Sequence, residues 1–388
     1  MLSKCSFVFL SCLPLAAQSV LRVGPGQTYV DIPPAVAAAV PGDLILIAAG
    51  SYSTFTLDRG ITLRADPPGA TVRVGSGAVS TAMMVAVPPG QRAHLEQLAL
   101  QQPIDMRPAV GATTAGVVSF TGVSSLATVT LTDASLAMHG CDLNGFGGHG
   151  IVLNGASALS AVQCTINASS GWFSIPPSAG IAAGGSSTVH CSDCDIEGGF
   201  LGVHTIVVIG SGIALSGSAR AFCVDSSIRA YQFSPGSPYG VGIDNQSSQP
   251  VTIERCAVLD SLGAANSWNG AVQAGLVLGL STPTSQGPVR GGVFQLDFRS
   301  RAGLPIVAHA AFGLGVPVRY PLLAQPDWGF VTNSVPIVLM LANAQGQATL
   351  AVSLPNSAWL QDVPLWFAGW TELALPVQMS PVLGGLIR

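Results

Sequence analysis

The sequence predicts an all-β protein in which a right-handed parallel β-helix, a solenoid, is followed by a small β-sandwich. Three observations point to this fold class. Similar sequence segments recur along the chain, spaced 23 residues apart at first and 30 to 32 residues apart later. Each segment contains short β-prone runs separated by Gly, Ser and Asn. None of the segments has the apolar period of a helix. Units this small cannot bury an apolar face alone, so successive units must stack.

Composition narrows the possible partners. Only 9% of the 388 residues are charged and 48% are hydrophobic, which is not the composition of a disordered chain. The net charge is −4 without a basic cluster, so neither nucleic acid nor an anionic membrane is an expected partner. Apolar runs after the N-terminus are too short to span a bilayer. Lys4 is the one lysine, which excludes a lysine Schiff base or a P-loop lysine elsewhere. We expect a monomer.

Residues 1–18 have the layout of a secretory signal peptide. Lys4 is followed by an apolar stretch from Cys5 to Leu15 and by the small residues Ala16 and Ala17. The alternative is a buried first strand. A signal peptide predicts a secreted or cell-surface protein and an oxidising environment for the remaining six cysteines.

Residues 19–280 are predicted to form the β-helix. A short amphipathic helix is expected around Ile32 to Ala39, followed by strands at Leu44 to Ala48 and Ile61 to Arg64. The phrase "AAAVPGDLILIAAGSY", followed by "LDRGITLRA", resembles the opening of secreted right-handed parallel β-helix proteins of the pectate-lyase-like superfamily. The resemblance implies a helical cap on a solenoid, and it is specific for fold rather than for activity.

Five repeats from Thr128 to Val258 align two columns of small or apolar residues. One column contains Cys141, Cys164, Cys194, Ser226 and Cys256, and the other, three residues earlier, contains Met138, Ala161, Cys191, Cys223 and Ile253. Both are expected to face inward. Adjacent coils are ~4.8 Å apart, within the Cα range of a disulfide, so we predict a disulfide between Cys191 and Cys223, with Cys141 and Cys164 as the next candidates. The CxxC spacing of Cys191 and Cys194 lacks the second pair that a zinc site needs.

Charged residues flank the first cysteine column. The position before it holds Gly140, Gln163, Asp193, Asp225 and Arg255, and the position after it holds Asp142, Thr165, Asp195, Ser227 and Ala257. Stacking would gather Asp193, Asp195 and Asp225 as oxygen ligands for Ca²⁺. The resemblance to pectate-lyase-like enzymes implies that Arg255 could act as a base beside Asp195 in a β-elimination. The alternative is a ladder of polar residues at a solenoid bend.

Aromatic residues lie in the inserted turns of the later repeats. Trp172, Phe173, Tyr231 and Tyr239 could form a platform for sugar rings, or they could simply cap the loops. No HExxH, GxSxG or dinucleotide-binding loop occurs in the chain.

The sequence pattern changes after residue 280. Residues 281–290 are predicted to be a linker, and residues 291–388 a β-sandwich of short strands without cysteine. This region loosely resembles the C-terminal module of secreted planctomycete-type and myxobacterial proteins, which implies surface or export biology. The sequence therefore predicts a secreted β-helix protein that binds or cleaves extracellular polysaccharide. The alternative is a non-catalytic structural solenoid with an attachment or secretion module.

Overall fold

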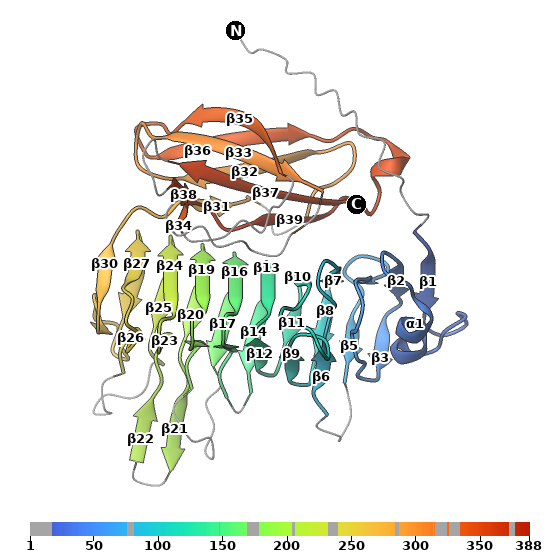
Figure 1. Cartoon of the computed structure of the whole chain (residues 1–388), viewed down its shortest axis with the longest axis horizontal. Helices are drawn as coiled ribbons and strands as arrows, with labels where there is room; N and C mark the ends of the chain where they lie inside the picture. Colours follow the sequence, from blue (N-terminus) through green and yellow to red (C-terminus); the bar gives the residue numbers. More distant parts are fainter. Residues whose placement is uncertain are drawn as a thin grey trace.

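The computed structural model describes most of the chain, in the ranges 18–75, 81–146, 148–168, 178–203, 206–231, 240–283, 287–312, 324–325, 334–371 and 377–388, together with residue 314. The predicted signal peptide, apart from residue 18, lies outside these ranges. The strands of the described chain form three long parallel sheets, one short hairpin and two C-terminal sheets that are mainly antiparallel, so the fold-class prediction is confirmed (Figure 1).

A short helix lies at the N-terminal end of the solenoid, as predicted. The helix α1 (Ile32–Ala38) begins where the side chain of Asp31 accepts a hydrogen bond of 2.8 Å from the amide of Ile32. Prolines occupy its first turn, where a missing amide donor costs nothing. The helix buries Ile32, Ala35 and Val36 against the first coil, and Figure 1 shows it at the blue end of the solenoid.

The solenoid consists of three parallel sheets, which we name A, B and C. Sheet A contains β1 (Val20–Val23), β2 (Leu44–Ile47), β4 (Thr62–Ala65), β7 (Arg92–Glu96), β10 (Val117–Thr121), β13 (Ser135–His139), β16 (Ala158–Val162), β19 (Thr188–Ser192), β24 (Arg220–Val224), β27 (Val251–Glu254) and β30 (Val272–Ala274). Sheet B contains β3 (Gly50–Tyr52), β5 (Val72–Val74), β8 (Leu98–Leu100), β11 (Ser124–Ser125), β14 (Asp142–Gly145), β17 (Thr165–Ala168), β20 (Asp195–Glu197), β25 (Ser227–Arg229) and β28 (Ala257–Leu259). Sheet C contains β6 (Met83–Val85), β9 (Ile104–Met106), β12 (Val129–Thr132), β15 (Ile151–Asn154), β18 (Ile181–Ala183), β23 (Ile213–Leu215), β26 (Ile243–Asn245) and β29 (Trp268–Asn269).

Each coil passes through sheets C, A and B in turn, and equivalent residues stack in register. The column predicted from the repeats is present residue by residue, because the register pairs Met138, Ala161, Cys191, Cys223 and Ile253 in succession. Its members face inward and join one continuous apolar core. Backbone hydrogen bonds between coils and this core together hold the solenoid.

A single residue in the left-handed region turns the chain from sheet A to sheet B. Its φ lies between 50° and 59° in Gln97, Gly122, Gly140, Gln163, Asp193, Asp225 and Arg255. The side chain that follows the bend then satisfies the carbonyl two residues back: the thiol of Cys164 donates to Val162 O at 3.2 Å, and the hydroxyl of Ser226 donates to Val224 O at 2.8 Å. The cysteine column can therefore contain serine, because either residue is a small donor at the bend.

Insertions between coils are accommodated where sheet B passes to sheet C. The largest described one is the antiparallel hairpin of β21 (Phe200–Val203) and β22 (Ile206–Ile209). It projects from the solenoid on the side away from the C-terminal sheets (Figure 1). A loop at this turn lengthens the coil without changing the register of the stack.

The C-terminal region is a two-sheet sandwich. The smaller sheet contains β31 (Gly279–Ser281), β32 (Val293–Arg299) and β36 (Gln347–Ser353). The larger contains β33 (Pro305–Ala311), β34 (Ala324–Gln325), β35 (Val335–Leu341), β37 (Pro364–Thr371), β38 (Val377–Met379) and β39 (Leu383–Leu386), and a 3₁₀ turn spans Ala358–Leu360. Phe294 stacks on Phe367 across the two sheets, with ring centroids 5.6 Å apart. The first strand of this module lies at 279–281, so the segment expected to be a linker begins inside it.

The sandwich lies on the outer face of sheet A (Figure 1). Val117, Ala137 and Ala158 of the solenoid form one buried cluster with Trp366 and other residues of the sandwich. Ion pairs Arg64–Asp362 and Glu96–Arg388 join the same two parts. No helix among the described residues is long and apolar enough to cross a membrane.

We expect the inward columns to dominate the stability of the solenoid. Ile196 is fully buried between Ile166 and Ile228 of the neighbouring coils. Ile196→Ala should lower the free energy of unfolding by about 2–5 kcal/mol, because it removes buried methylene groups and leaves a cavity. Ser227→Ala, on the outward face, should change it by less than about 0.5 kcal/mol. Denaturant titration of both variants checks this, and equal effects would contradict the assignment of inward and outward faces.

Candidate functional site

The charged residues predicted before the cysteine column are the bend residues between sheets A and B. Arg255 forms a two-point ion pair with Asp225, at 2.7 Å from Nε to Oδ1 and 3.1 Å from Nη2 to Oδ2. Asp193 accepts a hydrogen bond of 3.3 Å from Gln163 Nε2, which also donates to the carbonyl of Thr282 at 2.7 Å. These side chains therefore link one bend to the next, which is the polar ladder that the sequence left open as the alternative.

Asp195 lies apart from that ladder, on the outward face of sheet B. Arg229 Nη2 is 3.1 Å from Asp195 Oδ2, and Arg229 Nε is 3.0 Å from Glu197 Oε2. Arg229 and Glu197 were not among the site residues predicted from the sequence. The repeat alignment could have indicated this ion pair, because Glu197 and Arg229 occupy the same outward column in adjacent coils and are register partners.

The predicted metal ligands do not converge. Asp225 pairs with Arg255 at the bend, whereas Asp195 pairs with Arg229 on the sheet. Across the described ranges, no group of three or more His, Cys, Asp or Glu side chains is arranged to hold a metal ion. The expected calcium site at Asp193, Asp195 and Asp225 is thus a row of separately paired carboxylates, because alternate residues around a bend point in different directions.

The predicted catalytic pair is also separated. Asp195 is in register with Ser227, and Ser227 is in register with Ala257. Arg255 lies just before Ala257 in the sequence, so it is two coils away from Asp195. Two coil steps amount to roughly 10 Å. Since each residue already has its own ion-pair partner, the structure does not place the guanidinium of Arg255 beside the carboxylate of Asp195.

The cysteines are packed inside the solenoid. Cys191 and Cys223 are register partners, as the disulfide prediction requires, but both are free thiols in the structure. Hydrogen bonds with the thiols of Cys194 and Cys223, together with burial, raise the pKa of Cys191 well above its usual value. Burial likewise raises the pKa of Cys164 and Cys194. In this free form the thiols are protonated at neutral pH. The disulfide between Cys191 and Cys223 stays a prediction.

Of the aromatic residues predicted to contact a ligand, only Tyr231 lies within the described residues. Trp172, Phe173 and Tyr239 lie outside the described residues. Tyr231 is half-buried and follows β25 where sheet B passes to sheet C. The aromatic platform therefore stays a prediction.

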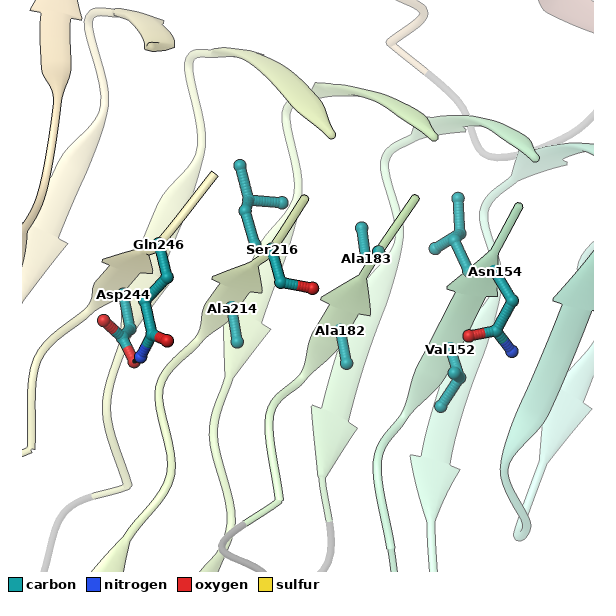
Figure 2. A pocket seen from close by; sticks show the side chains of 11 residues that line it. Val152, Asn154, Ala182, Ala183, Ala214, Ser216, Asp244 and Gln246 are labelled. Atoms are coloured by element: carbon teal, nitrogen blue, oxygen red, sulfur yellow. Dashed lines mark hydrogen bonds between the residues drawn. The ribbon is translucent and has the colours of Figure 1, made fainter. Parts of the chain in front are cut away.

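A shallow hollow of about 260 Å³ lies on the outward face of sheet C. It crosses the four strands β15, β18, β23 and β26, whose outward residues Val152, Ala182, Ala214 and Asp244 stack in register. Figure 2 shows the short side chains of Ala182 and Ala214 on the floor, between the larger residues on either side. The hollow exists because two successive coils carry alanine at this position.

The rim of the hollow is polar. Asn154, Ser216 and Gln246 follow the outward row at the turns toward sheet A, and Gln246 Nε2 donates to Asp244 Oδ2 at 3.0 Å. An apolar floor thus lies beside amide, hydroxyl and carboxylate groups that remain at the surface. Sequence reasoning missed this site because no motif marks it; only the alanines at one column position could have indicated it.

Comparisons with known proteins give no family for this chain. No protein-family model matches it, and no curated protein matches it. Among solved structures, it is similar to the full-length tailspike protein 2 of Escherichia coli O157:H7 bacteriophage CAB120, with 10% identity and a TM-score of 0.31, over 89% of this chain and 62% of that one. It is also similar to the enzymatically active domain of tailspike protein 4 of bacteriophage CBA120, with 11% identity and a TM-score of 0.29, over 89% and 64%. The chain thus spans less than two thirds of either protein, and scores this low carry no functional inference.

The bend role of Asp193 can be tested by substitution. Its φ of 55° suits Asp or Gly but strains a β-branched residue. Asp193→Val should lower the free energy of unfolding by about 1–2 kcal/mol, whereas Asp193→Gly should change it by less than about 1 kcal/mol. Thermal unfolding of the two variants measures the difference. A valine variant as stable as the glycine variant would show that the backbone does not select this residue.

Proposed function

We propose that this protein binds an extracellular polysaccharide along the outer face of sheet C, without cleaving it. The hollow over Ala182 and Ala214 carries this proposal. Sugar rings present apolar faces and hydroxyl edges, and the hollow offers methyl groups on its floor with amide, hydroxyl and carboxylate groups at its rim. Binding sites commonly combine apolar lining with a few placed polar groups in this way.

The shape of the hollow favours a polymer over an isolated small molecule. Its volume of about 260 Å³ is at or below the lower end of pockets that enclose a small ligand, and it follows the stacking direction of the coils. Equivalent positions recur at each coil, every ~4.8 Å. A chain of sugars lying along this direction can contact several coils at once, so weak contacts add up.

Binding without cleavage agrees with the placement of the carboxylates. A glycosidase needs two carboxyl groups across one bond, one of them in apolar surroundings that keep it protonated. Asp244 is the one carboxylate among the residues lining the hollow. Asp195 and Glu197 lie on sheet B and not at the hollow, and both are paired with the guanidinium of Arg229.

The test compares variants that fill the hollow with a matched control. Ala182→Leu and Ala214→Leu raise the floor, and each should weaken binding to a recognised polysaccharide by at least about tenfold, or ~1.4 kcal/mol. Thr130→Leu adds an equally large side chain to the same outward row two coils before Ala182, outside the hollow, and should bind like the unchanged protein. Affinity electrophoresis in gels containing neutral or anionic polysaccharides measures all three.

Two outcomes would contradict the proposal. New reducing ends or unsaturated products after incubation with the polysaccharide would show cleavage. Absence of binding to every polysaccharide tested, or equal binding by the Ala214→Leu and unchanged proteins, would instead favour a structural solenoid that acts as a spacer.

A further inference from the structure

Three histidines are buried on the outer face of sheet A, where the sandwich covers it. His94, His139 and His190 lie on β7, β13 and β19 and are 7%, 0% and 0% exposed. All three strands contact the sandwich. Glu96 on β7 pairs with Arg388, and β13 lies beside β39. The hydroxyl of Ser192 on β19 accepts a hydrogen bond of 3.1 Å from the amide of Leu280. Imidazole is the side chain whose charge changes most readily near neutral pH.

His94 has the most charged surroundings of the three. Its Nδ1 is 2.8 Å from Ser119 Oγ, and its ring meets Trp366 of the sandwich edge-on at 6.1 Å. Glu96 lies 3.8 Å from Nε2 and is itself bound by Arg388, while Arg64 pairs with Asp362 nearby. Burial lowers the pKa of His94 to about 4; Glu96 opposes this shift, and Arg64 and Arg388 add to it.

His139 and His190 have almost wholly uncharged surroundings. His139 Nε2 is 3.3 Å from Gln163 Oε1, and the ring also meets the backbone of Gly384 in the sandwich. His190 packs against Phe222, with ring centroids 6.4 Å apart, and its other register neighbour is Ser160. Burial lowers the pKa of His139 to about 4 and that of His190 to about 3.

We propose that the C-terminal sandwich is an acid-released cover: protonation of His94, His139 and His190 separates it from sheet A while the coils stay stacked. A charged imidazole is costly in this interface because burial removes it from water, and at His94 the nearby carboxylate of Glu96 offsets only part of that cost. Lifting the sandwich gives each ring access to water without breaking any hydrogen bond between coils. Backbone ladders and aliphatic columns hold the solenoid, and neither titrates in acid.

The direction of the pH effect follows from proton linkage. An exposed histidine has a pKa near 6.5, and the covered rings have lower values, so the uncovered form binds more protons. The covered form is therefore fully favoured above about pH 6.5 and loses its advantage as pH falls toward 4. At pH 5, a shift from about 6.5 to about 4 changes the closing equilibrium roughly 30-fold for each histidine.

A cysteine placed under the sandwich reports its release. Ala137 is fully buried in the cluster that joins the two parts, so Ala137→Cys places a thiol at the covered surface. A pyridyl disulfide reagent, which reacts with thiols in acid, should label this introduced thiol at least tenfold faster at pH 4.5 than at pH 7 in the full chain. The native thiols of Cys164, Cys191 and Cys194, which face the core, should stay unlabelled. Peptide mass mapping distinguishes the sites.

Histidine substitutions test the cause of the release. In the Ala137→Cys background, replacing His94, His139 and His190 by Gln should slow labelling at pH 4.5 by at least tenfold. His149→Gln is the matched control, because His149 has a pKa lowered by burial but accepts a hydrogen bond from Ala179 in a turn between sheets B and C. It should leave the acid response unchanged. If the triple variant already labels at neutral pH, His139→Gln alone should still slow labelling at pH 4.5 by at least tenfold.

The proposal fails if the introduced thiol and the native core thiols become labelled together, since acid then unfolds the whole solenoid. It also fails if the histidine variants respond to acid as the parent does. Small-angle X-ray scattering of the unsubstituted chain provides a second measurement. The radius of gyration should increase between pH 7 and pH 4.5 and return on neutralisation, and constant dimensions would overturn the proposal.

Discussion

The in-register stacking of coils is the constraint on which the rest of this structure depends. Parallel strands hydrogen-bond at a fixed spacing, so each position in a coil lies directly beside its equivalents in the coils before and after it. Ile166, Ile196 and Ile228 form one inward column in this way, and Val152, Ala182, Ala214 and Asp244 form one outward row. The core, the bends and the hollow on sheet C are all consequences of a single repeated geometry.

The same constraint explains why polar residues gather without forming a reactive centre. A bend made by one left-handed residue selects Gly, Asp or Gln at that position, and Arg255 occupies it as well. Because the coils stack, these residues align in one column, and that column resembles a metal or catalytic site when only the sequence is considered. Their partners show another role: the carboxylate of Asp225 neutralises Arg255, and Gln163 spans from one bend to the sandwich.

The repeat pattern made the fold and the columns predictable, whereas the partners of individual side chains were not. Aligning the cysteines placed Met138, Ala161, Cys191 and Cys223 in their correct register, since a column needs only sequence spacing. Pairs such as Arg64 and Asp362 join positions 298 residues apart, and no local pattern encodes them. The packing of the sandwich on sheet A could not be predicted from the sequence for the same reason. The hollow could not be predicted because short alanine side chains form no recognisable motif.

The sandwich also limits how the solenoid can change in length. A stack of identical coils can gain or lose one unit anywhere, because every new coil offers its neighbours the same columns. Here the cover is anchored to separate coils, at Arg64 on β4, Glu96 on β7, Ser160 on β16 and Asp225 after β24. One coil inserted between these anchors would move them apart by ~4.8 Å, more than a hydrogen bond can absorb. The sandwich therefore fixes the number of coils between its anchors, and repeats can be duplicated or deleted only outside that part of the solenoid.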